Sequence, residues 1–390
     1  MIRYTKWFLV LVVLLLTGCV GGAQYVEPQT RLSAVEAVGG DPGDRSADFA
    51  RVVEPRPFEL PRDHGPHPEY AIEWWYYTGN LQTDAGRHFG FQLTFFRYGL
   101  TPETPERSSD WATSSIYMAH FALADVADER FYAFERLSRG AAGLAGAQGE
   151  PTFEVWLEDW RITSENDGLP MRLNAEQDGV AIDLVLDTNR PVVLQGDRGY
   201  SQKGREHGNA SYYYSFTRLE TQGTVTVDGE SHAVRGLSWM DHEFGTEVLE
   251  ETSAGWDWFS IQLDNNTDIM YAQVRTADGN TQYTYGILIG ADGSYYLLET
   301  SEATLKVLDT WRSSYSGTEY PSGWRLQIPG ENIDLHIMPY LRDQELPLSV
   351  LYWEGAVQIE GTSNGQSVSG NGYVELTGYG EQQEEGLRIR

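Results

Sequence analysis

The sequence predicts an all-β protein made of two antiparallel β-barrel or sandwich domains, and three observations support this class. Aromatic residues make up 13% of the 390 residues, and 41 glycines and 16 prolines interrupt them. This composition is typical of strands joined by tight turns. Apolar and polar residues alternate over several segments; in 88–97, Phe89, Phe91, Leu93 and Phe95 share one face. A long pattern also recurs within the chain, which predicts two units of one design.

The recurring pattern has two matched ends. "GTVTVDGESHAVRGLSW" (223–239) resembles "GAVQIEGTSNGQSVSGNGY" (355–373) in its glycines, its Val-x-Gly step and an aromatic residue three positions later. Upstream, "WYYTGNLQTDAGRHFGFQLTFFR" ends at Arg97 and "WDWFSIQLDNNTDIMYAQVR" ends at Arg275. We therefore predict domains over 56–246 and 247–390. Each is expected to hide its sheet edges by closing into a barrel, and a small barrel of this kind has room for one apolar ligand.

The N-terminus predicts export and a lipid anchor. Arg3 and Lys6 precede an apolar run over 7–16 that is too short for a comfortable membrane span. The run ends in "LTGC", and Cys19 is the only cysteine in the chain. This is typical of a bacterial lipoprotein signal over 1–18, with lipidated Cys19 followed by a tether over 19–55. Val20 favours an outer-membrane, periplasm-facing location; an ordinary secretory signal is the alternative.

Charge and motif content exclude several partners. The formal net charge of −29 repels nucleic-acid phosphates and anionic headgroups. The sequence also shows neither a Walker nor a Rossmann glycine pattern, so we expect no nucleic-acid and no nucleotide partner. His64, His67 and His88 are conceivable metal ligands, but we expect no metal, because the "DHGPH" loop carries no cysteine or carboxylate at ligand spacing.

The stretch "EWWYY" (73–77) predicts a strand that is covered on both faces. Trp74 and Tyr76 point to one side of a strand, and Trp75 and Tyr77 point to the other. One interpretation has one face lining a barrel lumen, while the other packs beneath the proline-rich lead-in (55–70) or against the second domain. In the other interpretation all four side chains are core. The candidate ligand-binding residues are Trp74, Trp75, Tyr77, Trp239, Phe244, Trp258 and Tyr271.

Ionisable residues crowd into one aromatic strand, "GLSWMDHEFGTE" (236–247). Asp241 and His242 are adjacent there, and Asp257 follows in "GWDWFSIQL" (255–263). A carboxyl group among apolar neighbours has a raised pKa and can act as a general acid. We predict Asp241, His242 and Asp257 as catalytic residues. Alternatively, Asp241 caps a turn, His242 is a hydrogen-bonded core histidine, and Asp257 pairs with an arginine such as Arg275.

The second copy of the repeat lacks this ionisable pair. Glu375 stands at the position of Asp241, and Leu376 stands at the position of His242. We therefore predict that the reactive site lies at the end of the first domain, near the domain junction, and that Glu375 is not needed for it.

Several long motifs resemble one known family. "DHGPHPEYAIEWWYYTGNL", "FGFQLTFFR", "YYYSFTRL", "WMDHEFG" and "GWDWFSIQLD" look like the carotenoid 1,2-hydratase (hydroxyneurosporene synthase, CrtC/AttH-like) family of predicted secreted hydrolases. The resemblance covers about residues 50–385. It implies two lipocalin-like domains that handle a hydrophobic ligand without a cofactor, and in the hydratase branch it implies addition of water to a double bond.

The resemblance carries over only some functional residues. The hydratases have an Asp-His-Asn-Trp-Gly motif, of which Asp241, His242 and Gly245 match, whereas Glu243 and Phe244 differ. Tyr271 is the candidate for a tyrosine that the hydratases use downstream. "AQ" (272–273) supplies no carboxylate beside it. This departure argues against carotenoid hydration itself.

Two functions from different classes follow. The first is an envelope lipoprotein that binds a lipid-like or polyene molecule and hydrates or hydrolyses it. The second is a non-enzymatic lipid carrier or accessory to an envelope ABC transporter. A cavity into which Asp241, His242 or Asp257 points favours the enzyme, and an open apolar groove favours the carrier.

Overall fold

The computed structural model describes residues 48–102, 109–164, 168–205, 207–246, 249–250 and 252–380. This part of the chain consists of antiparallel strands and two short 3-10 segments, η2 (Arg62–His64) and η3 (Pro329–Glu331), without an α-helix. The predicted all-β class is confirmed. Within the same part, no helix has the length and apolar character needed to cross a membrane. Cys19 and the predicted signal lie outside the described residues.

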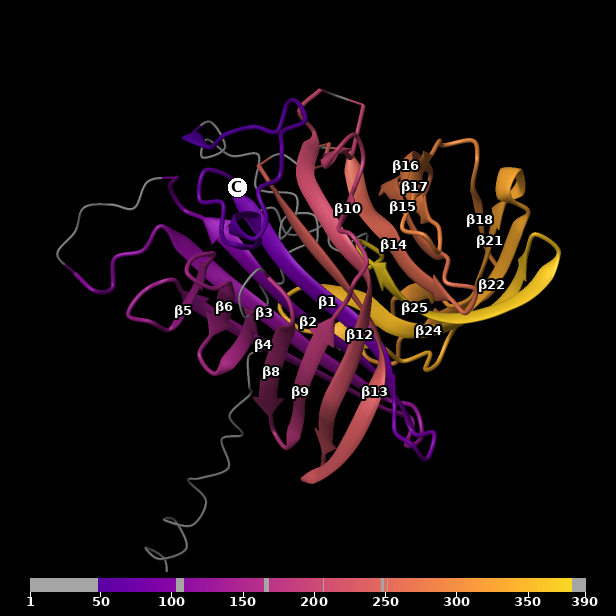
Figure 1. Cartoon of the computed structure of the whole chain (residues 1–390), viewed down its shortest axis with the longest axis horizontal. Coiled ribbons are helices and arrows are strands. Elements are labelled where there is room, and N and C mark those ends of the chain that lie inside the picture. Colours follow the sequence, from indigo (N-terminus) through magenta and orange to yellow (C-terminus); the bar gives the residue numbers. More distant parts are fainter. Residues whose placement is uncertain are drawn as a thin grey trace, which may run out of the picture. The chain divides into compact units, whose positions relative to one another are not determined.

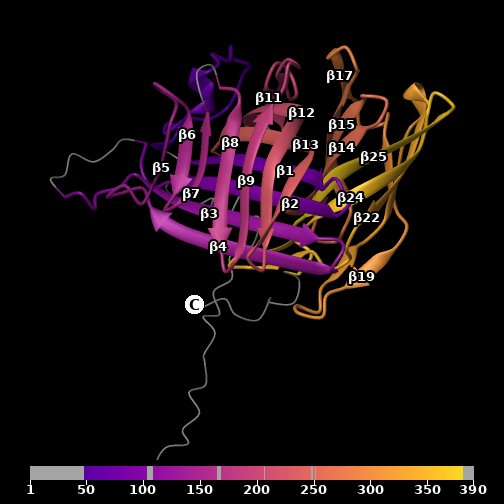
Figure 2. The same cartoon turned by 60° about the horizontal axis from the view of Figure 1, so that its bottom comes forward.

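The first sheet has thirteen strands and is nearly closed into a barrel (Figures 1 and 2). Its order is β4-β3-β2-β1-β13-β12-β9-β8-β7-β6-β5, and β10 and β11 also pair with β12. The strands are β1 (Ile72–Gln82), β2 (His88–Gly99), β3 (Ser115–Asp125), β4 (Arg130–Arg139), β5 (Ala145–Gln148), β6 (Glu154–Leu157), β7 (Trp160–Ser164), β8 (Met171–Gln177), β9 (Val180–Asp187), β10 (Val193–Leu194), β11 (Tyr200–Gln202), β12 (Ala210–Val227) and β13 (Glu230–Gly245).

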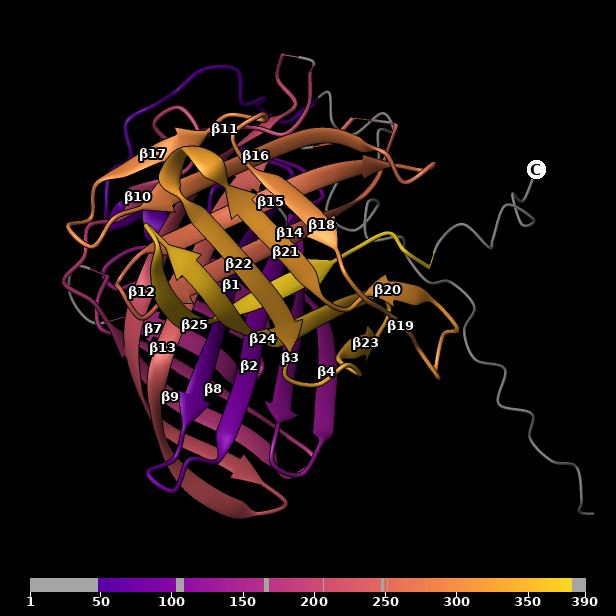
Figure 3. The same ribbon diagram turned by 90° about the vertical axis from the view of Figure 1, so that its right-hand side faces the viewer.

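The second sheet has ten strands in the order β17-β16-β15-β14-β25-β24-β22-β21-β18, and β23 pairs with β24 (Figure 3). A separate pair is formed by β19 and β20. The strands are β14 (Ser253–Leu263), β15 (Asp268–Thr276), β16 (Thr281–Ile289), β17 (Tyr295–Leu298), β18 (Thr304–Val307), β19 (Thr310–Arg312), β20 (Glu319–Pro321), β21 (Trp324–Ile328), β22 (Ile333–Pro339), β23 (Glu345–Pro347), β24 (Leu351–Ser363) and β25 (Gln366–Leu376).

The internal repeat corresponds to matching hairpins, β12–β13 in the first sheet and β24–β25 in the second. The first sheet ends at Gly245 and the second begins at Ser253, close to the predicted boundary. Both sheets belong to one compact unit, so the division into two domains remains a prediction. Phe49 and Val52, at the end of the predicted tether, are buried, and Val52 packs with Tyr70 and Phe244.

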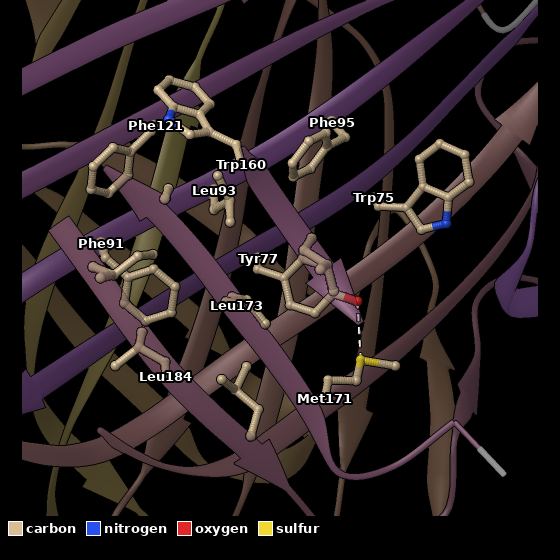
Figure 4. Packing of buried hydrophobic residues seen from close by; sticks show 14 of the residues in the cluster. Trp75, Tyr77, Phe91, Leu93, Phe95, Phe121, Trp160, Met171, Leu173 and Leu184 are labelled. Carbon is tan, nitrogen blue, oxygen red and sulfur yellow. Dashed lines mark hydrogen bonds between the residues drawn. The ribbon is translucent and has the colours of Figure 1, made fainter. Parts of the chain in front are cut away.

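The interior of the first barrel is a packed core. Trp75 and Tyr77 of β1 point into it and are fully buried among aliphatic and aromatic side chains (Figure 4). The hydroxyl of Tyr77 donates to the sulfur of Met171 at 3.0 Å, and Trp75 Nε1 donates to the carbonyl of His64 in the lead-in at 2.9 Å. This face of "EWWYY" therefore matches the core interpretation.

The opposite face of β1 packs against the second sheet. The ring of Tyr76 meets that of Trp258 edge to face, with centroids 5.3 Å apart. Asn80 Nδ2 donates to the carbonyl of Gly372 at 2.9 Å. The strand is therefore covered on both faces, by the barrel core and by the second sheet.

Candidate active site

A pocket lies where the two sheets meet. It offers about 70 Å³ to the centres of water-sized atoms, which is room for several water molecules or a small ligand. β1, β2, β12 and β13 line one side of it, and β14, β15, β16, β24 and β25 line the other. Its lining residues are Trp74, Tyr76, Gln92, Phe96, Lys203, Tyr213, Asp241, Glu243, Leu249, Trp256, Trp258, Val274, Tyr285, Tyr352, Glu354 and Glu375.

Asp241 reaches the pocket from β13 and is held by three donors. Tyr213 Oη donates at 2.7 Å, Trp239 Nε1 donates at 2.8 Å, and the Ser215 hydroxyl donates to the same carboxylate. Burial raises the pKa of Asp241 to about 7, although these hydrogen bonds favour the charged form. Asp241 can therefore gain or lose a proton near neutral pH.

Lys203 and Glu243 form a buried ion pair on the pocket wall, with Nζ and Oε1 3.0 Å apart. Burial opposes the charge on Lys203, but the carboxylate of Glu243 outweighs it and raises the pKa of the lysine. The ammonium group also lies 4.4 Å from the centre of the Tyr285 ring, where a cation is attracted to the ring face. Charge in this part of the pocket is therefore balanced.

Glu354 and Glu375 face each other across β24 and β25; Glu354 is fully buried and Glu375 is partly buried. Burial and the neighbouring Glu375 raise the pKa of Glu354 well above its usual range. Burial raises the pKa of Glu375 to about 8, and the charges of Glu243 and Asp241 act in the same direction. Glu354 Oε1 accepts no hydrogen bond from the residues that the structure describes. The pair therefore holds protons at neutral pH.

This arrangement can perform acid–base chemistry on an apolar ligand. Neutral carboxylic acids can donate a proton, and Asp241 is a base of matched pKa on the opposite wall. The rings of Trp74, Tyr76 and Trp258 present the polarisable faces that stabilise a cation.

His242 points away from the pocket, into the first barrel, because it follows Asp241 on the same strand. Its Nε2 lies 2.9 Å from Glu73 Oε1 and its Nδ1 lies 3.0 Å from the hydroxyl of Tyr214. Burial lowers the pKa of His242. Glu73 also pairs with Arg97 at 2.8 Å. His242 is therefore described by the alternative of a hydrogen-bonded core histidine.

Among the described residues, His67, Glu73 and His242 form one group that can hold a metal ion, with ligand atoms within 4.8 Å of one another. His67 Nδ1 lies 2.8 Å from Glu73 Oε1, the atom that His242 also approaches. A carboxylate thus does accompany the "DHGPH" histidines, contrary to the reason given from the sequence. The absence of a metal stays a prediction, which metal analysis of the purified protein would test.

Asp257 also lies outside the pocket. It is fully buried and bonds to Arg275 Nε at 2.9 Å, to Gln273 Nε2 at 2.6 Å and to the hydroxyl of Tyr379 at 3.0 Å. The alternative of a pair with Arg275 describes its position. The alternation of β14 turns Asp257 into the second sheet's core, while Trp256 and Trp258 face the pocket.

The predicted ligand-binding residues divide by strand face. Trp74 and Trp258 line the pocket, and Trp239 supports it through Asp241. Trp75 and Tyr77 belong to the first core, and Tyr271 belongs to the second. Phe244 stacks on His67, with ring centroids 3.6 Å apart.

Sequence reasoning missed Lys203, Glu243 and Glu354 as pocket residues, and it placed Glu375 outside the site. The repeat contained the relevant signal, because Asp241 and Glu375 occupy matching positions of two strands. Once the two sheets pack face to face, matching positions meet in one pocket. The prediction that Glu375 is not needed therefore has no support from the geometry.

The fold and pocket define a class: an all-β protein with acidic groups buried between two sheets. A family model described as AttH-like matches residues 51–379, so the chain belongs to the AttH-like family. This confirms the resemblance to the CrtC/AttH-like family. A search of curated proteins found no match.

Solved structures agree with this assignment. The chain is similar to a provisionally assigned AttH from Nitrosomonas europaea, with 35% identity and a TM-score of 0.77 over 85% of this chain and 99% of that one. Kievitone hydratase from Nectria haematococca is 17% identical, with a TM-score of 0.64 over 85% and 98% of the two chains. CghA with Sch210972 is 13% identical, with a TM-score of 0.52 over 87% and 97%. The last two likenesses show the fold alone.

Proposed function

We propose that this protein is a cofactor-free hydratase that adds water to a carbon–carbon double bond of a small lipophilic molecule held between the two sheets. The observation that carries the proposal is the set of buried carboxyl groups, Asp241, Glu354 and Glu375, facing the tryptophan and tyrosine rings of one pocket. The fold shared with kievitone hydratase is a secondary support.

In the proposed reaction, Glu354 gives its proton to one alkene carbon, and the π electrons form the new C–H bond. The cation left on the other carbon is stabilised by the faces of Trp74 and Trp258. Water adds to this carbon while Asp241 takes one water proton, which gives the neutral alcohol. Asp241 is a better base than Glu354, because three donors stabilise the carboxylate form of Asp241.

The size of the pocket supports a small substrate over a long polyene. The centres of water-sized atoms can occupy only about 70 Å³ of it, which suits a compact molecule. The enzyme is also favoured over the lipid carrier, because Asp241 points into the pocket. We further propose that Cys19 anchors the protein at the outer membrane, on the periplasmic side; an ABC transporter remains a proposed partner of the carrier alternative only.

Water labelled with oxygen-18 tests this function with any mixture that contains the substrate. Purified protein is incubated with a lipophilic metabolite extract in labelled water, and mass spectrometry compares wild type with Glu354→Gln. We expect products heavier by one labelled water molecule with wild type alone. The same products with both proteins, or none with wild type, would contradict the proposal.

A further inference from the structure

A chain of hydrogen-bonding groups leads from the pocket to the surface of the first sheet. The hydroxyl of Tyr352, which lines the pocket, lies 2.7 Å from Nδ1 of His120. Nε2 of His120 lies 3.1 Å from Glu135 Oε2. His120 is buried with 1% of its side chain exposed, whereas Glu135 exposes 22%. The hydrogen-bonded side chains of Glu135, His120 and Tyr352 therefore connect solvent with the pocket wall.

The inner end of this chain lies on the same strand face as the proposed proton donor. Tyr352 and Glu354 are two residues apart on β24, so their side chains lie on the same face. Both line the pocket, and the Tyr352 hydroxyl is near enough to Glu354 to favour its charged form. Gln92 Nε2 donates to Tyr352 Oη at 3.1 Å, which fixes the position of the hydroxyl.

The proposed reaction requires a route of this kind. Glu354 ends each turnover without its proton, whereas Asp241 on the opposite wall ends with an extra one. Glu354 must therefore regain a proton before the next cycle. We propose that Glu135, His120 and Tyr352 form a proton relay that carries protons between solvent and Glu354. The relay rests on the proposed function for its purpose, but its proton transfer can be measured separately.

Each step of the relay breaks one bond to hydrogen and forms another. Glu135 takes a proton from water and passes it to Nε2 of His120. Nδ1 of His120 passes its proton to the oxygen of Tyr352, whose own hydroxyl proton moves to the carboxylate of Glu354. The net change is one proton moved from water to Glu354. The two neutral tautomers of His120 are the states before and after transfer.

The same contacts also join the two sheets, since His120 lies on β3 and Tyr352 on β24. Loss of stability in a His120 variant therefore does not distinguish a relay from a structural link. Proton exchange at Glu354 does distinguish them, because a structural link has no need to carry protons.

Infrared spectroscopy of the full protein, without substrate, tests the relay. The carboxylic-acid band of Glu354 is identified as the band lost in Glu354→Gln, and its shift is timed after rapid mixing with D₂O. We expect His120→Phe, which keeps an aromatic ring beside Phe96 and Tyr352, to slow this shift at least about 10-fold. Added imidazole should restore the rate in His120→Ala, where the truncated side chain leaves room for it.

Two further variants complete the test. Glu135→Gln, at a partly exposed position, should slow the exchange even if the His120 variants fail to fold. The matched control is His64→Phe, since His64 Nδ1 lies 2.6 Å from the hydroxyl of Tyr214 within the barrel, away from Glu354. Wild-type exchange in folded His120→Phe or Glu135→Gln, or equal slowing by His64→Phe, would overturn the relay. Because no substrate is involved, these outcomes are independent of whether hydration occurs.

Discussion

The buried acidic side chains of this protein differ in their partners, and the partners determine what each can do. Glu73 and Asp257 are each paired with an arginine, Arg97 and Arg275 respectively. Glu354 and Glu375 face each other, and no arginine among the described residues pairs with either of them. An ion pair keeps a carboxylate charged, whereas burial beside a like charge keeps it protonated. The arginine-paired acids therefore serve the fold, and the acids without an arginine are available for proton transfer.

Substituting Glu375 should change how stability depends on pH. The pKa of Glu375 is raised to about 8 in the folded protein, so the folded side chain keeps its proton up to about pH 8. In the unfolded chain the same side chain ionises above about pH 4.5. The stability it contributes is present at low pH and is lost as pH rises through about 8. We expect Glu375→Gln to remove part of this loss, on the order of a few kcal/mol. Urea unfolding of wild type and Glu375→Gln at pH 5 and pH 9 would measure this difference. An equal pH dependence of stability in the two proteins would contradict the prediction.

Removing the charge of Glu73 should destabilise the fold strongly. Glu73→Gln leaves Arg97 buried without its ion-pair partner and disturbs the contacts of His67 and His242. Breaking a buried ion pair from one side costs about 3–5 kcal/mol. Chemical denaturation would measure the loss, with the exposed Glu360→Gln as control. A change comparable to that of the control would show that the network does not hold the fold.

For single residues, the sequence predicted Asp241 as a site residue because its carboxyl group stands in an aromatic strand. It also offered the correct structural alternatives for His242 and Asp257. Lys203 and Glu354 could not be predicted, because only the packing of β24 and of the segment between β11 and β12 against their neighbours brings them to the pocket.

The corresponding strands of the two sheets follow one order, so that β1, β13 and β12 are matched by β14, β25 and β24. Gly236 and Gly370 occupy equivalent places: a Cβ atom would lie 2.0 Å from the carbonyl oxygen of Asn80 and 2.3 Å from that of Gln262, respectively. The Val-x-Gly step of the repeat therefore marks a close approach between strands.

Only part of the repeat was aligned correctly from the sequence. By its contacts with the neighbouring strand, Gly223 corresponds to Gly361 and not to Gly355. Gly223 pairs with Val234 and Gly361 pairs with Val368, so both strands of the two hairpins correspond, and the second hairpin turns two residues sooner after this glycine. A difference in hairpin length of this kind is invisible to pattern matching that starts from one glycine.

Gly370→Ala should weaken the pairing of β25 with β14. The added methyl group would overlap a backbone carbonyl, which cannot move without breaking the ladder. We expect a loss of about 1–3 kcal/mol, as for other overpacked sites. Thermal unfolding would measure it against Gly330→Ala, a position with no heavy atom within 4 Å of the added group. Similar melting of the two variants would refute the close approach.

The two sheets are joined by a buried charged cluster as well as by the pocket. Asp268 of β15 is fully buried and meets Arg190 and Arg218 of the first half of the chain, each with a nitrogen 3.0 Å from a carboxylate oxygen. Such a contact fixes how the sheets meet. This mutual placement, which creates the pocket, was the feature that the sequence could not supply, since strand periodicity shows which face is buried but not what covers it.

Membrane attachment should depend on Cys19 alone. Cys19→Ser removes the thiol that would carry the lipid and should release the protein from membranes with its fold intact. Fractionation followed by a high-salt wash would measure this, with circular dichroism as the folding control. A variant that stays bound to membranes after the wash would contradict the lipoprotein prediction.

The central claim is that the pocket between the sheets performs the chemistry, and the turnover of Asp241→Asn tests it most directly. The substitution keeps the shape of the side chain but removes the base, so turnover of the water-labelled product should fall about 100-fold or more. Glu360→Gln, exposed on β24, should leave turnover unchanged. A folded Asp241→Asn protein that keeps wild-type turnover would contradict the assignment of the active site to this pocket.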